Sequence, residues 1–199
     1  MTLISDKYTF GFTAASLRLS DFVRIAKLVM EDKDIDHINL LGGGKSSTGK
    51  RMITEYNKRL ESLTKDQSWL LVNGVLPVQK QLAFLAVCKT YSFIRDFTVE
   101  VVREKALLFD YELSDGMFNT FLRRKTDIHP ELEKITEKTT YKIRQVTFKI
   151  LEEAGLIDNI KNKIIQPQIV DKDVFKVIIN ENCEWLKILL ISDADIHNQ

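Results

Sequence analysis

Four polar side chains recur at helical spacing in the second half of the chain, and together they could bind phosphate groups. Lys138, Lys142, Gln145 and Lys149 follow one another at intervals of four, three and four residues. A helix would place all four on one side. Amines on such a face can neutralise successive phosphates, and an amide can reach the edge of a base. The pattern favours nucleic-acid binding. The alternative is an ordinary solvated helix face.

The opposite side of the same predicted helix is apolar, as a helix packed on a core requires. Its apolar positions are Ile143, Val146, Ile150, Leu151 and Ala154. We place Tyr141 and Phe148 along one edge of the basic side. Gly155 follows the last apolar position, and glycine is the residue that most often ends a helix in the left-handed conformation. The spacing therefore predicts a helix that stops at Gly155.

A short β-hairpin is predicted after this stop. Leu156 and Ile157 begin an apolar run, residues 158–163 are mostly polar, and Ile164 and Ile165 return the chain as a second strand. A helix followed by two short strands is the outline of a recognition helix with a wing. A glycine-capped helix followed by a simple loop remains the alternative.

We predict double-stranded DNA as the ligand, with RNA as an alternative. Lys138, Lys142 and Lys149 would hold phosphates, and Tyr141, Arg144 and Gln145 are the next candidates. Further basic residues could extend the surface: Lys50, Arg51, Arg123 and Arg124 from other helices, and Lys161 and Lys163 from the predicted wing. The competing interpretation is a scaffold whose apolar helices bind other proteins, while its basic side chains only keep it in solution.

Catalytic chemistry finds no support in the sequence. Gly44, Gly49 and Lys50 have the spacing of a phosphate-binding loop. Arg51 stands where that motif needs a hydroxyl for magnesium, and no buried strand precedes the string. The three histidines are scattered without a ligand partner at helical spacing. We therefore predict no catalytic residue, no metal and no cofactor, and a protein that is not an enzyme.

Composition sets the remaining bounds. The 199 residues carry a net charge of only +1, so binding to an acidic partner must depend on local basic patches. The longest uncharged run, Gln67 to Gln79, is too short and too interrupted to cross a bilayer. No signal peptide is recognisable at the N-terminus, and Cys88 lies in an apolar helical run as a small core residue. We expect a soluble cytoplasmic protein.

The fold class predicted from these patterns is mainly α. Helices are predicted at about 13–30 (capped by Thr13 or Ser16), 49–63 (capped by Ser47 or Thr48), 66–76, 78–109 with a break at 90–96, 115–125, a short one after His129-Pro130, and two between 171 and 191. We divide the chain into an N-terminal helical bundle, residues 1–110, and a winged-helix-like C-terminal domain with a helical tail, residues 111–199. Phe84, Tyr91, Phe93 and Phe97 are predicted to pack in the bundle rather than to stack on bases.

Several stretches of the sequence resemble one protein family. They are residues 83–97 (AFLAVCKTYSFIRDF), 100–105 (EVVREK), 129–132 (HPEL), 142–146 (KIRQV) and 151–157 (LEEAGLI). In combination they look like BrxA, the small helical component of BREX bacteriophage-defence systems. The resemblance covers about residues 10–167 and is weakest in the glycine loop and the tail.

The resemblance implies a non-enzymatic bacterial protein encoded beside a methyltransferase, an ATPase and a phosphatase-like protein, with other BREX proteins as partners. It implies a fold similar to the NusB antitermination factor, an all-helical RNA-binding protein. The family has also carried an inner-membrane label, which the hydropathy of this chain argues against. The family provides no settled active site, so the candidate residues above rest on helix geometry.

Overall fold

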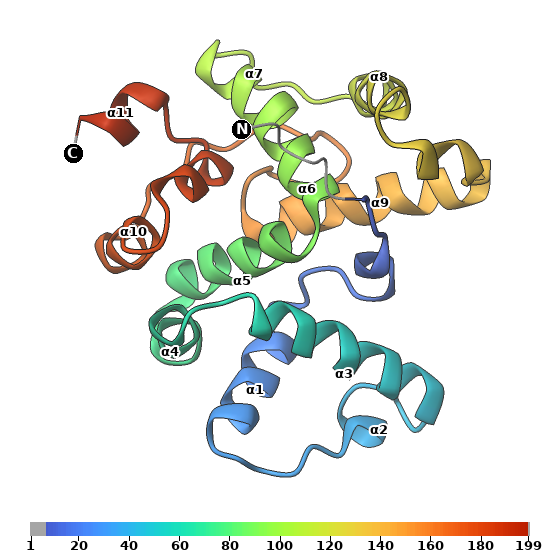
Figure 1. Cartoon of the computed structure of the whole chain (residues 1–199), viewed down its shortest axis with the longest axis vertical. Helices are drawn as coiled ribbons and strands as arrows, with labels where there is room; N and C mark the ends of the chain where they lie inside the picture. The colour runs from blue at the N-terminus through green and yellow to red at the C-terminus, as the bar shows by residue number, and fades with distance from the viewer. Residues whose placement is uncertain (1–6, 199) are drawn as a thin grey trace.

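The computed structural model describes residues 7–198 and is mainly helical (Figure 1). Residues 1–6 and 199, at the outer ends of the two predicted domains, lie outside this range. The α-helices are α1 (Leu19–Met30), α2 (His37–Leu40), α3 (Ser46–Glu61), α4 (Lys65–Asn73), α5 (Leu76–Thr90), α6 (Ser92–Phe97), α7 (Glu104–Leu107), α8 (Asp115–Thr126), α9 (Glu137–Ala154), α10 (Lys172–Ile179) and α11 (Asp193–His197). Short 3-10 helices are η1 (Gly11–Ala14), η3 (Pro130–Lys134) and η4 (Cys183–Leu189), and η2 (Thr98–Arg103) is a π-helix.

The first long helix begins later than predicted. The chain forms η1 and then an extended stretch, and α1 starts after Arg18, whose φ of 44° is left-handed. Neither Thr13 nor Ser16 caps α1, because Phe12 and Leu17 are fully buried on either side of them and fix this segment to the core. Val29, in the last turn of α1, is 47% exposed.

Helix α3, in contrast, begins three residues earlier than predicted, at Ser46 rather than Gly49. Its N-cap is Lys45, so Ser47 and Thr48 lie inside α3 and neither caps it. The inner face of α3 holds a buried cation: Arg59 is 0% exposed and donates to the carbonyl oxygens of Ala15 (2.6 Å) and Ser16 (2.7 Å). These bonds attach the extended stretch before α1 to α3. Burial lowers the pKa of Arg59 to about 10.

Helix α5 is the central element of the fold. Residues 81–88 are buried without exception, so this part of the helix is covered on all sides. It contacts α1, α3, α4, α6 and α9, and Figure 1 shows it in the middle of the molecule. Cys88 is a buried free thiol, as predicted. Tyr91, with extended backbone angles, separates α5 from α6.

Aromatic rings join the two halves of the sequence. Phe97 packs edge-on against Phe118, Phe121 and Phe148, with ring centroids 5.3–6.0 Å apart. Phe93 also contacts Phe118 and Phe121. The predicted packing role of these phenylalanines is confirmed. The buried apolar residues form one cluster from Tyr8 to Ile196, and the division at residue 110 stays a prediction.

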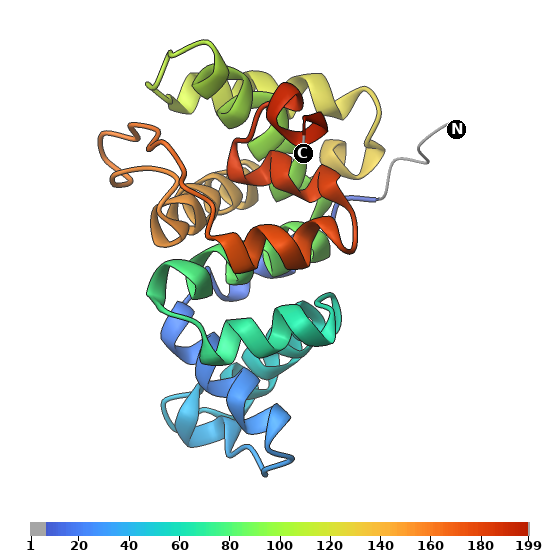
Figure 2. The ribbon, with the colours of Figure 1, turned by 90° about the vertical axis from the view of Figure 1, so that its left-hand side faces the viewer.

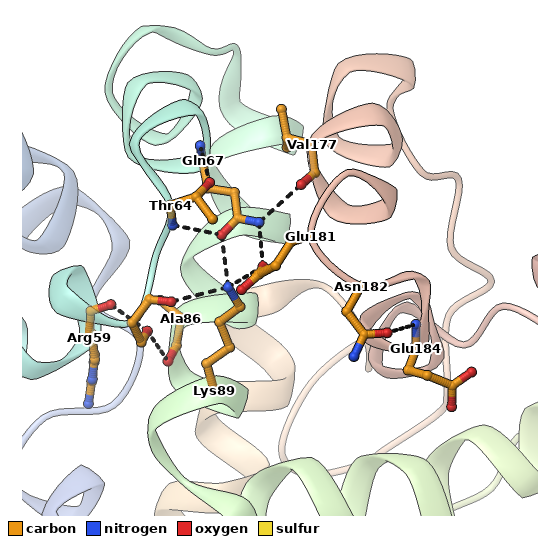
Figure 3. A network of polar contacts seen from close by, with 10 residues as sticks. Arg59, Thr64, Gln67, Ala86, Lys89, Val177, Glu181, Asn182 and Glu184 are labelled. Atoms are coloured by element: carbon orange, nitrogen blue, oxygen red, sulfur yellow. Dashed lines mark hydrogen bonds and ion pairs between the residues drawn. The ribbon is translucent and has the colours of Figure 1, made fainter.

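A polar network attaches the C-terminal tail to the first half of the chain (Figure 3). The Lys89 amine on α5 bonds the carboxylate of Glu181 (2.5 Å), the side-chain oxygen of Gln67 (3.0 Å) and the carbonyl of Ser62 (3.1 Å). The Gln67 amide donates in turn to the Val177 carbonyl on α10 and to Glu181. The two predicted tail helices are thus present, as α10 and the 3-10 helix η4, and both pack on the fold.

The predicted β-hairpin is not confirmed. Residues 7–198 contain no strand, only two isolated antiparallel bridges, Ile157 to Ile165 and Glu112 to Ile164. Two backbone hydrogen bonds nevertheless fold the segment back on itself, from Asp158 N to Ile164 O and from Gln166 N to Leu156 O, both 2.9 Å. The paired stretches on the two sides are too short to form a β-ladder, because most of the residues between Leu156 and Gln166 belong to the turn.

Candidate nucleic-acid interface

The helix predicted to carry the binding residues is present as α9. Thr136 caps its N-terminus by accepting a hydrogen bond from Thr139 N, and Gly155 ends it with a φ of 81°. Every apolar position predicted to face inward is buried: Ile143, Val146, Ile150, Leu151 and Ala154. Phe148 was expected at the edge of the basic side and is instead 3% exposed, because its ring fills the space beside Phe97 and Phe118.

The outer side of α9 carries cations in water. Lys138, Lys142 and Gln145 are exposed, and neither lysine makes a hydrogen bond or ion pair with any residue between 7 and 198. Lys149 is also exposed, but its amine lies 2.5 Å from the carboxylate of Glu152. This hydrogen bond raises the pKa of Lys149. Two of the three predicted phosphate-binding lysines are therefore free, and the third shares its charge with a neighbouring carboxylate.

Tyr141 and Arg144 form a pair at the edge of this face. Tyr141 is 58% exposed, and the Arg144 guanidinium lies 5.5 Å from the centre of its ring. A cation over an aromatic face is held in place with both groups still partly solvated. The pair could contact a ligand as one unit.

The loop after α9 has a defined shape made by two short side chains. The Asp158 carboxylate accepts from Asn159 N (2.6 Å) and Ile164 N (2.8 Å). The Asn159 side-chain oxygen accepts from the backbone of Lys161 and Asn162. Loss of hydration alone would raise the pKa of Asp158, but these hydrogen bonds outweigh it and lower the pKa. Lys161 is exposed on this loop. Figure 2 shows the loop projecting beside the end of α9, from the same edge of the molecule.

The last cation of this loop points inward. Lys163 has a positive φ of 58°, its side chain is only 17% exposed, and its amine lies 5.3 Å from the centre of the Phe148 ring. The same amine is 3.3 Å from the carboxylate of Asp115 on α8, and the Arg144 guanidinium approaches the other oxygen at 3.6 Å. The structure thus brings Arg144 and Lys163 together on one carboxylate.

The four remaining candidates lie elsewhere. Arg123 and Arg124 are exposed near the end of α8, where Arg124 pairs with Glu100 at 2.8 Å. Lys50 and Arg51 are exposed on α3. Both views place α3 and α8 toward opposite ends of the molecule (Figures 1 and 2), so these two pairs do not form one patch with each other. The segment 42–50 follows the short helix α2 rather than a strand.

Sequence reasoning missed the acidic partners of the basic residues. Glu152 follows Lys149 by three residues, a spacing that indicates an ion pair on a helix, so its contact was predictable. Asp115 left no comparable signal, because it reaches Arg144 only through tertiary packing. Among residues 7–198 there is no group of three or more side chains arranged to hold a metal. No helix in that part of the chain is long and apolar enough to span a bilayer.

Comparisons with known proteins agree with this architecture. A crystal structure of an uncharacterized protein from Magnetospirillum magneticum superposes with a TM-score of 0.79 at 22% identity, covering 92% of this chain and 98% of that one. BREX protein BrxA of Escherichia coli O9:H4 (strain HS) is 27% identical over 71% of this chain and 70% of its own length. BREX protein BrxA of Paramagnetospirillum magneticum is 23% identical over 92% of this chain and 96% of its own. The BrxA family model matches residues 6–182. Because this match spans most of the sequence, the chain belongs to the BrxA family.

Proposed function

We propose that this protein is a non-enzymatic, cytoplasmic component of a BREX phage-defence system that binds double-stranded DNA through α9 and works with other BREX proteins. The names of its relatives support the defence role. The observation that carries the DNA proposal is the outer side of α9, where Lys138 and Lys142 have no partner among the described residues while the other side of the helix is buried.

The order of elements around α9 supports a winged-helix arrangement. Helix α8 and the short η3 precede α9, and the bonded loop 158–163 follows it. The segment before α8 hydrogen-bonds the far side of that loop, from Ile165 N to Tyr111 O (2.7 Å) and from Leu113 N to Lys163 O (3.1 Å). In a winged helix-turn-helix, the second helix of the motif enters the major groove and its partner crosses the backbone. We assign these roles to α9 and α8.

In this arrangement each group has a distinct role. Lys138 and Lys142 neutralise phosphates, which supplies most of the affinity. Gln145 and Tyr141 extend from the same face toward base edges, where an amide can bond adenine in two places. Lys161 reaches a phosphate from the loop. Lys149 contributes less, because part of its charge already acts on Glu152.

Fluorescence anisotropy with a labelled DNA duplex at 50 mM salt tests the proposal. The double variant Lys138→Ala/Lys142→Ala should bind at least tenfold more weakly than wild type, since it loses two phosphate contacts. The matched control is Lys172→Ala/Lys176→Ala, which removes two exposed lysines from α10. Equal losses in both variants would mean that only net charge matters. No loss in the first would remove α9 from the interface.

RNA is distinguished from DNA by competition. A duplex RNA of the same sequence should displace the labelled DNA poorly, because the deep, narrow major groove of A-form RNA does not admit a helix. Displacement at equal concentration would favour the RNA-binding alternative.

The scaffold function has one observation in its favour. Leu108 and Phe109, after α7, are 76% and 81% exposed, and Phe109 has a positive φ of 59°. Two adjacent exposed apolar side chains could supply the apolar part of a protein contact. Co-purification of other BREX proteins after nuclease treatment, lost in Leu108→Ser/Phe109→Ser but retained in Lys138→Ala/Lys142→Ala, would establish this function separately from DNA binding.

A further inference from the structure

Asp115 lies between two cations of the proposed DNA-binding surface. It is the first residue of α8, and its side chain is 49% exposed. One carboxylate oxygen is 3.6 Å from the Arg144 guanidinium and the other is 3.3 Å from the Lys163 amine. The two cations belong to α9 and to the loop that follows it, so this single carboxylate faces both parts of the surface.

Both cations are held in place by contacts other than Asp115. Arg144 lies over the Tyr141 ring and Lys163 lies over the buried Phe148 ring. The Lys163 backbone is also fixed, because its carbonyl accepts a hydrogen bond from Leu113 N. The two side chains are only 23% and 17% exposed. Their charges would therefore stay close to their present positions if the carboxylate were removed.

The ion pairs themselves are weak. Both separations are longer than the 2.7–2.9 Å typical of a charge-assisted hydrogen bond, and Asp115 is half exposed to solvent. A pair of this kind contributes little to stability, so removing the carboxylate should leave the fold intact. A phosphate oxygen has the same charge and the same preference for Arg and Lys as a carboxylate oxygen.

We propose that Asp115 competes with the DNA backbone for Arg144 and Lys163 and so limits the affinity of this surface for DNA. This inference rests on the proposed function. In the free protein the Asp115 carboxylate pairs with both cations. On binding, the DNA engages the lysines of α9 and of the loop, while Arg144 and Lys163 stay paired with Asp115. Asp115 thus keeps DNA binding moderate and reversible.

The variant Asp115→Asn tests the proposal, because it removes the charge and keeps the shape. It should bind duplex DNA about fivefold more tightly at 100 mM salt. The slope of log affinity against log salt should become steeper by about 1.8, since two further phosphates are engaged. Asp127→Asn is the matched control: it removes an equal charge just after α8, from an exposed residue whose side chain has no bonded partner among the described residues. It should leave both quantities near wild type.

A second pair of variants keeps the test specific. In the background Arg144→Gln/Lys163→Gln, the effect of Asp115→Asn should disappear, because no cation remains to be released. Asp115→Ser should reproduce the gain if the charge is responsible. If wild type binds DNA and Asp115→Asn binds it with the same affinity, the role of Asp115 is wrong while the proposed function stands. The same holds if Asp127→Asn gains as much affinity as Asp115→Asn. If the wild-type protein does not bind duplex DNA at 50 mM salt, the proposed function is wrong, and this inference is wrong with it.

Discussion

Replacing Lys89 with methionine should destabilise the fold by about 2 kcal/mol, for reasons visible in the network of Figure 3. The Lys89 side chain is 5% exposed and its amine has three oxygen partners. After the change, Gln67 still accepts from Thr64 N and Glu181 still accepts from the Gln67 amide, so these oxygens keep a donor. The Ser62 carbonyl loses the donor that Lys89 supplied.

The magnitude follows from these partners. A part-buried acceptor left without a donor costs about 1–3 kcal/mol. Loss of the pair with Glu181, whose side chain is 33% exposed, adds at most about 1 kcal/mol. Methionine retains most of the apolar contacts of the lysine stem, so the cavity is small. The variant no longer has to bury a charged amine, and this gain offsets part of the loss. The net destabilisation is about 2 kcal/mol. For a chain of this size the thermal midpoint should fall by roughly 4–8 °C.

Urea titration and thermal unfolding measure the effect. The urea midpoint should fall with an unchanged slope, since the same surface is exposed on unfolding. Lys176→Met, an exposed lysine on α10, is the control and should stay within about 0.5 kcal/mol of wild type. If Lys89→Met is as stable as this control, the tail is attached by its apolar side chains alone and the reasoning from the polar network fails.

Three further predictions concern binding, acid stability and the end of α9. If Lys138, Lys142 and Lys161 each neutralise one phosphate, raising the salt concentration from 50 to 200 mM should weaken duplex binding about 40-fold. In Lys138→Ala/Lys142→Ala the same change should weaken binding only about fourfold, because one phosphate contact remains. Anisotropy measures both effects. Hydrogen bonds from Arg103 and Lys187 lower the pKa of Asp193 to about 2 from its ordinary 3.8. Its contribution is therefore complete above that ordinary value and is lost as pH falls toward 2, so the thermal midpoints of wild type and Asp193→Asn should differ at pH 5 and converge near pH 2. Gly155→Ala should cost about 1 kcal/mol in urea titration because its φ is 81°, whereas Gly155→Asn should cost less. An unaffected Gly155→Ala would mean that the helix end relaxes.

Local patterns predicted the helices well where one side is buried against the core. The spacing of apolar residues located α9, and Gly155 located its end, because both depend on neighbours in sequence. Residues 82–88 of α5 are apolar at every position, and all of them are buried. The helix predicted at 115–125 is present as α8, and Ser114 caps it by accepting from Met117 N at 3.3 Å.

Tertiary contacts decided the features that the sequence did not reveal. In the sequence, Arg59 cannot be told from the exposed basic residues of α3. It is buried because its guanidinium donates hydrogen bonds to the carbonyl oxygens of residues 15 and 16. Phe148 falls at the edge of a helical wheel, but its ring is drawn inward by Phe97. Asp115 gains its significance only because α8 begins beside α9 and the following loop. Spacing along the chain could not indicate any of these three.

The aromatic cluster has a consequence for how the protein is made. Phe97 gains its contact with Phe148 only after the ribosome has added 51 more residues. At about 5–20 residues per second, this interval lasts about 3–10 seconds, during which the Phe97 ring lacks the contact that Phe148 will supply. Tyr8 waits even longer in the sequence for its stacking partner His129. A nascent chain that pauses before α9 would expose these rings for longer, and chaperones would have most access to it at that stage.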